Sequence, residues 1–272
     1  MEKNIPSSTA PACSGLNGRR ILLTRASHQN QQLAAALSGL GAVTIELPLL
    51  EIAPPASYAA LDQVIEEWRE YEIAIFTSAN GVHALFARAQ SLCRSLRIPG
   101  SVCAMGPATA RALADYGWQA ALMPEKFVAE SAAELLAPLA QNRRVVILQA
   151  AEARDILEYA LSQAGGRVTA VAAYQTRMPA EAPARLRELL APPQPSGPPR
   201  RLDAILLTSA LAVTHLIQAL GPDYSHQLTG IALGAIGPIT RQKIISYGLA
   251  PAFTAPEYTA AGLIAGLQNY FQ

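Results

Sequence analysis

FTSANGV at residues 76–82 and AMGPAT at residues 104–109 bound a stretch that the chain contains twice. The second copy reads LTSALAV at residues 207–213 and AIGPIT at residues 235–240, and it aligns with the first at one offset of 131 residues, without a gap. An internal repeat constrains the fold more strongly than other features of a sequence. Two copies of this length indicate paired domains, because a solenoid needs at least three repeats.

A second unit is repeated around that stretch. Residues 21–23 predict a buried strand, residues 27–40 a helix with an apolar face, and residues 43–47 another strand. The same order returns as a strand at 145–148, a helix at 152–163 and a strand at 168–172. The two kinds of unit therefore alternate along the chain.

Strands and helices also alternate within the opening stretch and its copy. We expect the elements of the first copy at 72–76, 80–89, 101–104, 107–116 and 131–139, after a helix at 58–68. The second copy should repeat them at 204–207, 210–220, 231–233, 238–247 and 259–268. Such alternation predicts an α/β protein with two similar parallel-sheet domains, each with helices on both faces.

Composition supports a compact chain. The 272 residues include 51% hydrophobic and 15% charged residues, which fits two domains of modest size. The net charge of +1 is too small to give a positive electrostatic field that would attract nucleic acid. No apolar run reaches the ~18 residues of a membrane helix. Cys13, Cys93 and Cys103 show neither a disulfide framework nor zinc-ligand spacing, so a reducing cytoplasm is expected. Residues 1–17 are expected to be a flexible tail.

Two proline-containing segments follow the first kind of unit, at residues 48–55 and 174–183. Either a simple tandem with a boundary near Asn142 or a crossed arrangement, in which the chain passes between domains at both segments, fits the residues. The pattern alone does not choose between them. A further Pro-rich stretch, 192–199, is expected to be a surface loop.

The turns after the strands of the opening stretch are suited to anions. Ser78 and Ser209 each follow a buried strand and precede a helix, and Gly106-Pro107 and Gly237-Pro238 start further helices that carry Thr109 and Thr240 in their first turns. Free backbone N–H groups at helix starts attract anions, and ligands of parallel sheets bind at this edge. The alternative is that these residues only cap helices. Four turns in two matching pairs favour a ligand with several carboxylates or phosphates.

The sequence contains none of the common catalytic motifs GxSxG, HExxH, GxxxxGK[ST] or GxGxxG after a strand. Its four histidines show no metal-ligand spacing and are expected to be surface or internally bonded residues. No metal site is predicted.

Seven segments together resemble the uroporphyrinogen-III synthase family, over nearly all of residues 19–267. The segments are ILLTR (21–25), GLGA with ELPLLEI (39–52), FTSANGV, AMGPAT, VAAYQTRMP (171–179), LTSALAV and AIGPIT. Their order and spacing make the resemblance specific, although each segment alone is weak.

The resemblance implies the crossed arrangement, with a two-stranded connector and an active site in a cleft between the domains. The domains would be 18–47 with 180–272, and 53–173, connected by 48–52 and 174–179. It also implies the substrate hydroxymethylbilane, a linear tetrapyrrole with eight carboxylates. The family closes it to uroporphyrinogen III with loss of water and inversion of ring D, without a cofactor.

Residues carry over from the family by position. Tyr174 matches the family's proposed general acid, and a phenol is protonated at neutral pH. Ser78, Thr109, Ser209 and Thr240 match polar substrate-binding positions, and Asn80 and Arg25 are weaker matches. Gln149-Ala150 departs from a common Arg-Gly pair, although Arg154 follows shortly.

Two other readings stay open at this point. One is a two-lobed polyanion-binding protein without chemistry, and the other is an inactive relative, motivated by Gln149-Ala150. We expect a small-molecule substrate and neither a nucleic-acid nor a membrane partner. We also expect a monomer, with transient contact to the preceding pathway enzyme as an open alternative.

Overall fold

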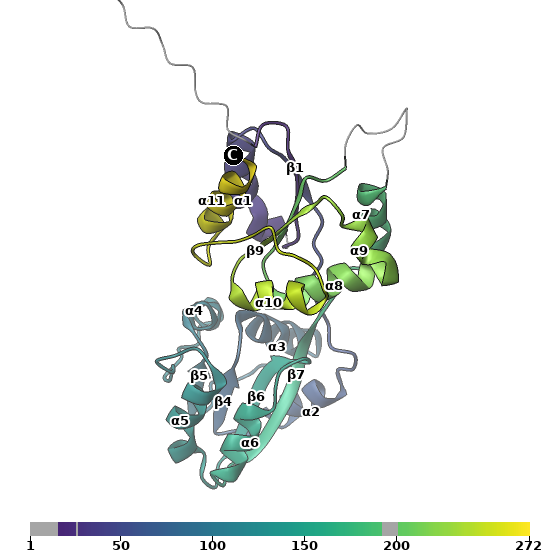
Figure 1. Ribbon diagram of the computed structural model, residues 1–272. Coiled ribbons are helices and arrows are strands. Elements are labelled where there is room, and N and C mark those ends of the chain that lie inside the picture. The colour runs from purple at the N-terminus through teal and green to yellow at the C-terminus, as the bar shows by residue number, and fades with distance from the viewer. Residues whose placement is uncertain (1–15, 26, 192–200) are drawn as a thin grey trace, which may run out of the picture. The chain divides into compact units, whose positions relative to one another are not determined.

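The computed structural model describes residues 16–25, 27–191 and 201–272. Residues 1–15 of the expected tail and the expected loop at 192–199 lie outside these ranges. The end of the expected tail is wrong, because Leu16 is fully buried in an apolar cluster with residues of β1 and α1. The described residues up to Glu51 and from Met178 onward form one compact unit, and Ile52–Arg177 form a second (Figure 1).

The first unit is built on a five-stranded sheet with the order β10-β9-β8-β1-β2. Neighbouring strands in this sheet pair in parallel. The strands are β1 (Arg20–Leu23), β2 (Val43–Glu46), β8 (Ala204–Leu207), β9 (Ala232–Ala235) and β10 (Phe253–Thr254). The helices are α1 (Ser27–Gly39), α7 (Ala182–Leu190), α8 (Ala210–Leu220), α9 (Tyr224–Gln227), α10 (Pro238–Ser246) and α11 (Ala260–Phe271), with a 3₁₀ turn at Gly221–Asp223.

Alternating side chains of this sheet form a separate core on each face. Leu22, Ile205 and Leu233 belong to a cluster with residues of α7, α8 and α10. Ile21 and Leu206 belong to a cluster with α1 and α11 on the other face. Successive strand residues point to opposite faces, so both faces of the sheet are covered by helices.

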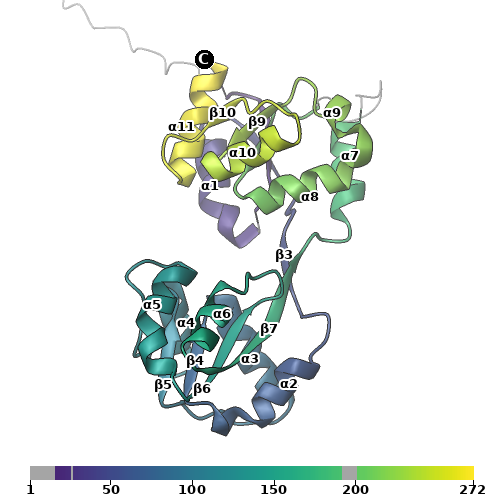
Figure 2. The same cartoon turned by 60° about the horizontal axis from the view of Figure 1, so that its bottom comes forward.

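The second unit has a sheet with the order β3-β7-β6-β4-β5. The strands are β3 (Glu51–Ala53), β4 (Ile73–Phe76), β5 (Ser101–Ala104), β6 (Arg144–Ala150) and β7 (Arg167–Arg177), the long strand labelled in Figure 2. The helices are α2 (Ala59–Glu66), α3 (Ala79–Ser91), α4 (Pro107–Asp115), α5 (Ala129–Ala140) and α6 (Ile156–Gln163), with a 3₁₀ turn at Trp68–Glu70.

This sheet also carries a core on each face. Phe76 and Leu148 belong to a cluster with residues of α2, α3 and α4. Ile75 and Ile147 belong to a cluster with α5 and α6. The expected fold class, two mainly parallel sheets with helices on both faces, is confirmed.

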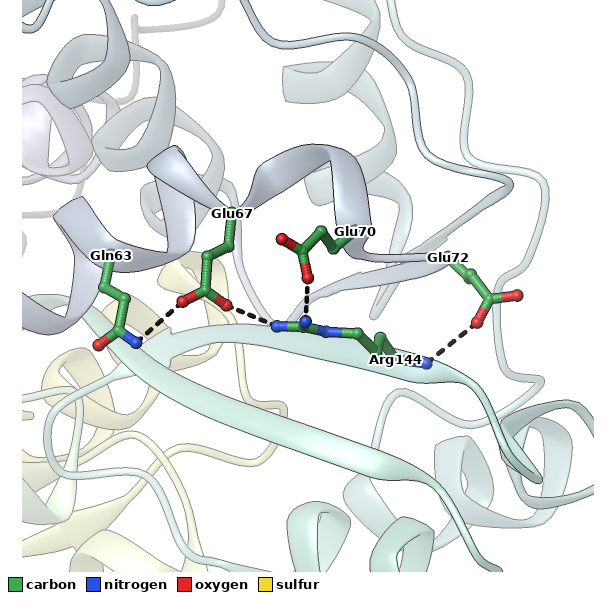
Figure 3. A network of polar contacts seen from close by, with 5 residues as sticks. All are labelled: Gln63, Glu67, Glu70, Glu72 and Arg144. Carbon is green, nitrogen blue, oxygen red and sulfur yellow. Dashed lines mark hydrogen bonds and ion pairs between the residues drawn. The ribbon is translucent and has the colours of Figure 1, made fainter.

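An ion-pair network fixes the start of β6 to the end of α2 and the 3₁₀ turn that follows (Figure 3). The Arg144 guanidinium contacts the Glu67 and Glu70 carboxylates, and the Arg144 backbone N–H donates to Glu72 Oε2 at 3.2 Å. Gln63 Nε2 donates to Glu67 Oε1 at 3.0 Å. The Gln63 hydrogen bond and then the Arg144 hydrogen bond lower the pKa of Glu67 below its ordinary value.

Some elements differ from the sequence expectations. Strand β7 continues past residue 172 to Arg177 and therefore contains Tyr174. The segment 48–55 contains the short strand β3, and α7 begins inside the segment 174–183, at Ala182. Helix α6 begins at Ile156 instead of residue 152; Glu152 Oε1 accepts a hydrogen bond from the backbone N–H of Thr176. None of the helices in the described ranges has the length and hydrophobicity of a membrane span.

Candidate active site

The carboxyl edge of the second sheet gathers three of the segments that sequence analysis singled out. The parallel registers place Phe76 opposite Leu148 and Ala104. Ser78, Gly106 and Ala150 each come two residues after that level, on neighbouring strand ends. Ala150 in turn pairs with Tyr174 across a register shift at Gln149/Ala150.

Ser78 and Tyr174 meet at this edge. Ser78 Oγ lies 2.9 Å from the Tyr174 hydroxyl oxygen, although the residues are 96 positions apart. Ser78 is also the N-cap of α3, and its Oγ accepts a hydrogen bond from the Gly81 N–H at 3.2 Å. Tyr174 is only 8% exposed, so its phenol is held in a mostly buried position with one fixed hydroxyl partner.

The neighbouring turn starts α4. Gly106 is the N-cap, Pro107 follows at the first helical position, and Thr109 in the first turn is buried. Proline suits that position because its missing N–H would be unpaired there. The exposed ring of Phe127 covers Gly106: a Cβ added to the glycine would lie 3.5 Å from the ring.

The first unit repeats this edge. Ser209 caps α8 by accepting from the Ala212 N–H at 3.1 Å, and its φ and ψ of −157° and 158° nearly equal the −159° and 160° of Ser78. Gly237-Pro238 starts α10, Thr240 is buried, and the exposed Tyr258 ring lies 3.1 Å from a Cβ added to Gly237.

Arg25 lies at the same edge of the first unit. It follows β1, which pairs in parallel with β8, the strand before Ser209. Asn30 Nδ2 donates to the Arg25 carbonyl at 2.7 Å, which fixes the backbone of the turn. The preceding Thr24 donates its hydroxyl proton to the Leu206 carbonyl at 2.7 Å.

The two edges differ in one chemical respect. In the first unit Ile21 pairs with Thr44, and in the second unit Val145 pairs with Val168. When these two pairs are aligned, Leu50 is the residue that corresponds in sequence to Tyr174. Leu50 packs against an apolar core. The phenol beside the capping serine therefore belongs to the second unit alone.

A hollow of about 450 Å³ opens beside Tyr174 within the second unit. Asn80 lines it, as do Tyr58, His83 and Arg88, which sequence analysis did not select. The available signal was helical spacing, because positions 80, 84, 87, 88 and 91 share one face of α3. The partners from β3 and β7 that complete the hollow could not be read from that spacing.

Cys103 and His215 are buried and are not candidates for the chemistry. Burial raises the pKa of the Cys103 thiol to about 11, so this thiol is protonated at neutral pH. His215 Nδ1 lies 2.6 Å from the Leu49 carbonyl oxygen and is a core histidine with a partner. Gln149 lies at the end of β6, and Arg154 is exposed. In the described ranges, no group of three or more His, Cys, Asp or Glu side chains could hold a metal ion.

Two mainly parallel sheets with repeated polar helix starts at their carboxyl edges define a two-unit α/β protein. Proteins of this class bind ligands at the carboxyl edges of their sheets. A family model described as uroporphyrinogen-III synthase HemD matches residues 31–265. The uroporphyrinogen-III synthase of Synechococcus elongatus is 33% identical over 264 residues, covering 94% of this chain and 96% of that protein. This chain belongs to the uroporphyrinogen-III synthase family.

Further relatives agree with this assignment. A putative uroporphyrinogen-III synthase of Methanothermobacter thermautotrophicus is 28% identical, covering 90% of this chain and 96% of that protein. The crystal structure of a mutant uroporphyrinogen III synthase from the extremely thermophilic bacterium Thermus thermophilus superposes with a TM-score of 0.63 at 21% identity, covering 94% of this chain and 99% of that chain. The Helicobacter pylori uroporphyrinogen-III synthetase gives a TM-score of 0.54 at 16% identity, covering 91% and 97%. At these identities the two structures support the fold.

Proposed function

We propose that this chain is a cofactor-independent cyclising lyase that converts hydroxymethylbilane to uroporphyrinogen III, with loss of water and inversion of ring D, in tetrapyrrole biosynthesis. Family membership over residues 31–265 supports the reaction. The observation that carries the assignment of the site is the 2.9 Å contact between the hydroxyls of Ser78 and Tyr174, at a sheet edge.

Tyr174 is the proposed general acid. Its phenol gives a proton to the terminal hydroxyl of the substrate, the C–O bond breaks with its electron pair going to oxygen, and water leaves. The adjacent pyrrole nitrogen supplies the electron pair that forms the exocyclic double bond. Ring D then attacks the new electrophilic carbon through the α-carbon that already bears the methylene to ring C, which gives a spiro intermediate. The bond between that α-carbon and the methylene breaks with its electron pair going to ring D, and the methylene, now the electrophile, bonds to the other α-carbon of ring D, which inverts the ring. The proton lost from that second α-carbon restores the phenol. No outside oxidant or reductant is needed.

Ser78 is proposed to stabilise the phenolate formed in that step. Its Oγ accepts the Gly81 N–H, and its own O–H can donate to the Tyr174 oxygen once that oxygen carries the negative charge. A hydrogen bond to an ionised acceptor is about twice as strong as one between neutral groups. The same serine that caps α3 therefore lowers the cost of proton release.

The carboxylate arms are proposed to bind at the helix starts of both units. Ser209 and Thr240 serve in the first unit together with Arg25, and Thr109 and Asn80 serve in the second. The support is the repeated geometry of the caps and of the Gly-Pro turns, with the positive ends of helix dipoles at the same edges. Holding a flexible tetrapyrrole folded supplies much of the rate enhancement that such a reaction needs.

The two compact units are proposed to be the two domains, with 48–52 and 174–179 as the connector; the contact boundaries after Glu51 and Arg177 support this division. We propose a cytoplasmic monomer that makes transient contact with the preceding pathway enzyme. The free Cys93 and Cys103 thiols are compatible with a reducing compartment.

The purified chain should convert freshly prepared hydroxymethylbilane to a product that, after oxidation, separates as the type III isomer. The type I isomer, which forms without enzyme, is the sole product expected if the proposal is wrong. Tyr174→Phe should lower kcat by about 10²–10⁴-fold, the usual contribution of a general acid. Tyr159→Phe, at an exposed position of α6, is the matched control and should behave as wild type.

A further inference from the structure

The hollow beside Tyr174 has the size and the lining of a ligand-binding subsite. Its volume of about 450 Å³ lies within the ~300–1,000 Å³ of small-molecule pockets, and every lining residue belongs to the second unit. Tyr174 and Ala173 contribute from β7, Ile52 and Ala53 from β3, and one face of α3 forms the opposite side. The proposed acid is therefore part of the wall.

The hollow is lined by a set of apolar side chains and a set of polar side chains. Small or flat apolar groups come from Ala53, Pro54, Ala84, Ala87 and Ala173, which leave room for a planar ring against the wall. Asn80, His83 and Arg88 are the nitrogen-bearing side chains of the lining, and all three project from α3. A ring with anionic substituents fits this division, because its face is apolar and its arms need hydrogen-bond donors.

Arg88 is held rigidly. Its Nε and Nη2 each donate to one oxygen of Asp62 at 2.7 Å, and its guanidinium carbon lies 4.0 Å from the centre of the Tyr58 ring. The pair uses two of the five N–H donors of an arginine, so donors remain for a second carboxylate. A guanidinium fixed by a carboxylate and an aromatic ring loses little side-chain freedom when it binds such a ligand.

The volume selects the size of the occupant. At the roughly 30 Å³ that a water-sized group takes in a liquid, the ~15 non-hydrogen atoms of one pyrrole with two carboxylate arms need at most about 450 Å³. The four rings of a linear tetrapyrrole need several times as much. One ring with its arms is therefore the part of the substrate that this hollow accommodates.

We infer that the hollow binds the pyrrole ring that carries the hydroxymethyl group, with Arg88 as a specificity-determining residue that holds a carboxylate arm of that ring. The inference rests on the proposed function, because Tyr174 in the wall must reach the leaving hydroxyl. Binding the terminal ring here places its hydroxymethyl carbon near the phenol. Asn80 and His83 are further donors for the arms.

Arg88→Met removes the guanidinium and keeps an unbranched side chain. We expect KM for hydroxymethylbilane to rise about 10-fold or more, with kcat within about 2-fold of wild type, since a charge-assisted hydrogen bond is lost before the chemical step. Arg94→Met is the matched control, because Arg94 is exposed beyond α3 and outside the hollow, and it should keep the wild-type KM. An unchanged KM in Arg88→Met would overturn the inference.

A second pair of variants guards against a local packing effect of losing the contacts to Asp62 and Tyr58. Ala87→Phe fills the hollow from the exposed side of α3 and should weaken the binding of uroporphyrinogen III, measured by calorimetry, at least 10-fold. Gln90→Phe adds the same ring at an exposed position of α3 outside the hollow and should bind as wild type. Equal binding by both variants contradicts the subsite.

Different outcomes would overturn the subsite and the proposed function. If the wild type produces the type III isomer while Arg88→Met and Ala87→Phe match it in KM and binding, only the subsite is wrong. A wild-type product that is type I alone removes the proposed function, and the subsite with it.

Discussion

At the scale of single residues, the two copies of the repeat distinguish helix capping from the proposed chemistry. Ser78 and Ser209 adopt the same backbone conformation and accept the same kind of N–H bond, but only Ser78 has a phenol within 2.9 Å. Leu50 stands at the position that corresponds to Tyr174. Under the proposed function, one copy of the edge therefore serves binding alone, while the other also supplies the proton donor.

This difference predicts distinct effects of one substitution at the two serines. Ser78→Ala and Ser209→Ala should each destabilise the protein by about 1 kcal/mol, the usual cost of losing a side-chain N-cap. Ser78→Ala should also lower kcat by about 10-fold, because the Tyr174 phenolate loses a donor. Ser209→Ala should raise KM instead. Denaturant unfolding and steady-state kinetics on both variants measure these effects, and equal kcat losses in the two would contradict the division.

At the scale of secondary structure, the elements with buried apolar runs between turn residues were predicted most closely. Strands 101–104 and 204–207 have the predicted bounds, because each is an apolar run placed before a Gly-Pro or Thr-Ser turn. The alternation of strands and helices did not assign β3 or the end of β7, because their pairing joins segments about 120 positions apart in the chain; strands at 48–52 and 174–179 were expected from the family resemblance. The strand expected at 168–172 and the connector strand expected from residue 174 form one continuous strand, β7.

The candidate site shows the same limit. The repeat and the family resemblance pointed to Ser78, Ser209 and Tyr174, but no spacing in the sequence announces a contact between positions 78 and 174. Arg88 was overlooked because its role depends on Asp62 and Tyr58 from the neighbouring helix region and on β3 and β7. Local patterns thus predict which residues lie at a sheet edge, and long-range pairing decides which of them meet.

Two helical glycines give a test of packing at the element scale. A Cβ on Gly262 in α11 would lie 2.1 Å from the Glu257 carbonyl oxygen, a backbone atom that cannot rotate away, whereas a Cβ on Gly39 in α1 meets nothing within 4 Å. Gly262→Ala should therefore cost about 1–3 kcal/mol of unfolding free energy. Gly39→Ala should be neutral or stabilising by up to about 1 kcal/mol. Urea denaturation followed by circular dichroism compares them, and a neutral Gly262→Ala would contradict the packing of α11.

At the scale of the whole molecule, the chain leaves the first unit after Glu51 and returns to it at Met178. The second unit is therefore one continuous segment with a core on each face of its sheet. The first unit is assembled from two segments, and β1 from the earlier segment lies between β2 and β8. The two units of similar fold thus depend on the chain in different ways.

That connectivity predicts which pieces fold. Residues 52–177 should fold alone, since they contain four strands of their sheet, all five helices and both apolar clusters. Residues 178–272 should not, because without β1 and α1 the edge of β8 is unpaired and Ile21, Leu23, Leu33 and Leu37 are missing from the core. The amide proton chemical shifts should be widely dispersed for the fragment 52–177 and confined to the narrow range of an unfolded chain for the fragment 178–272. Adding a peptide of residues 16–51 should restore dispersion to 178–272, and a fragment 178–272 that unfolds cooperatively by itself would show that β1 is dispensable to the sheet.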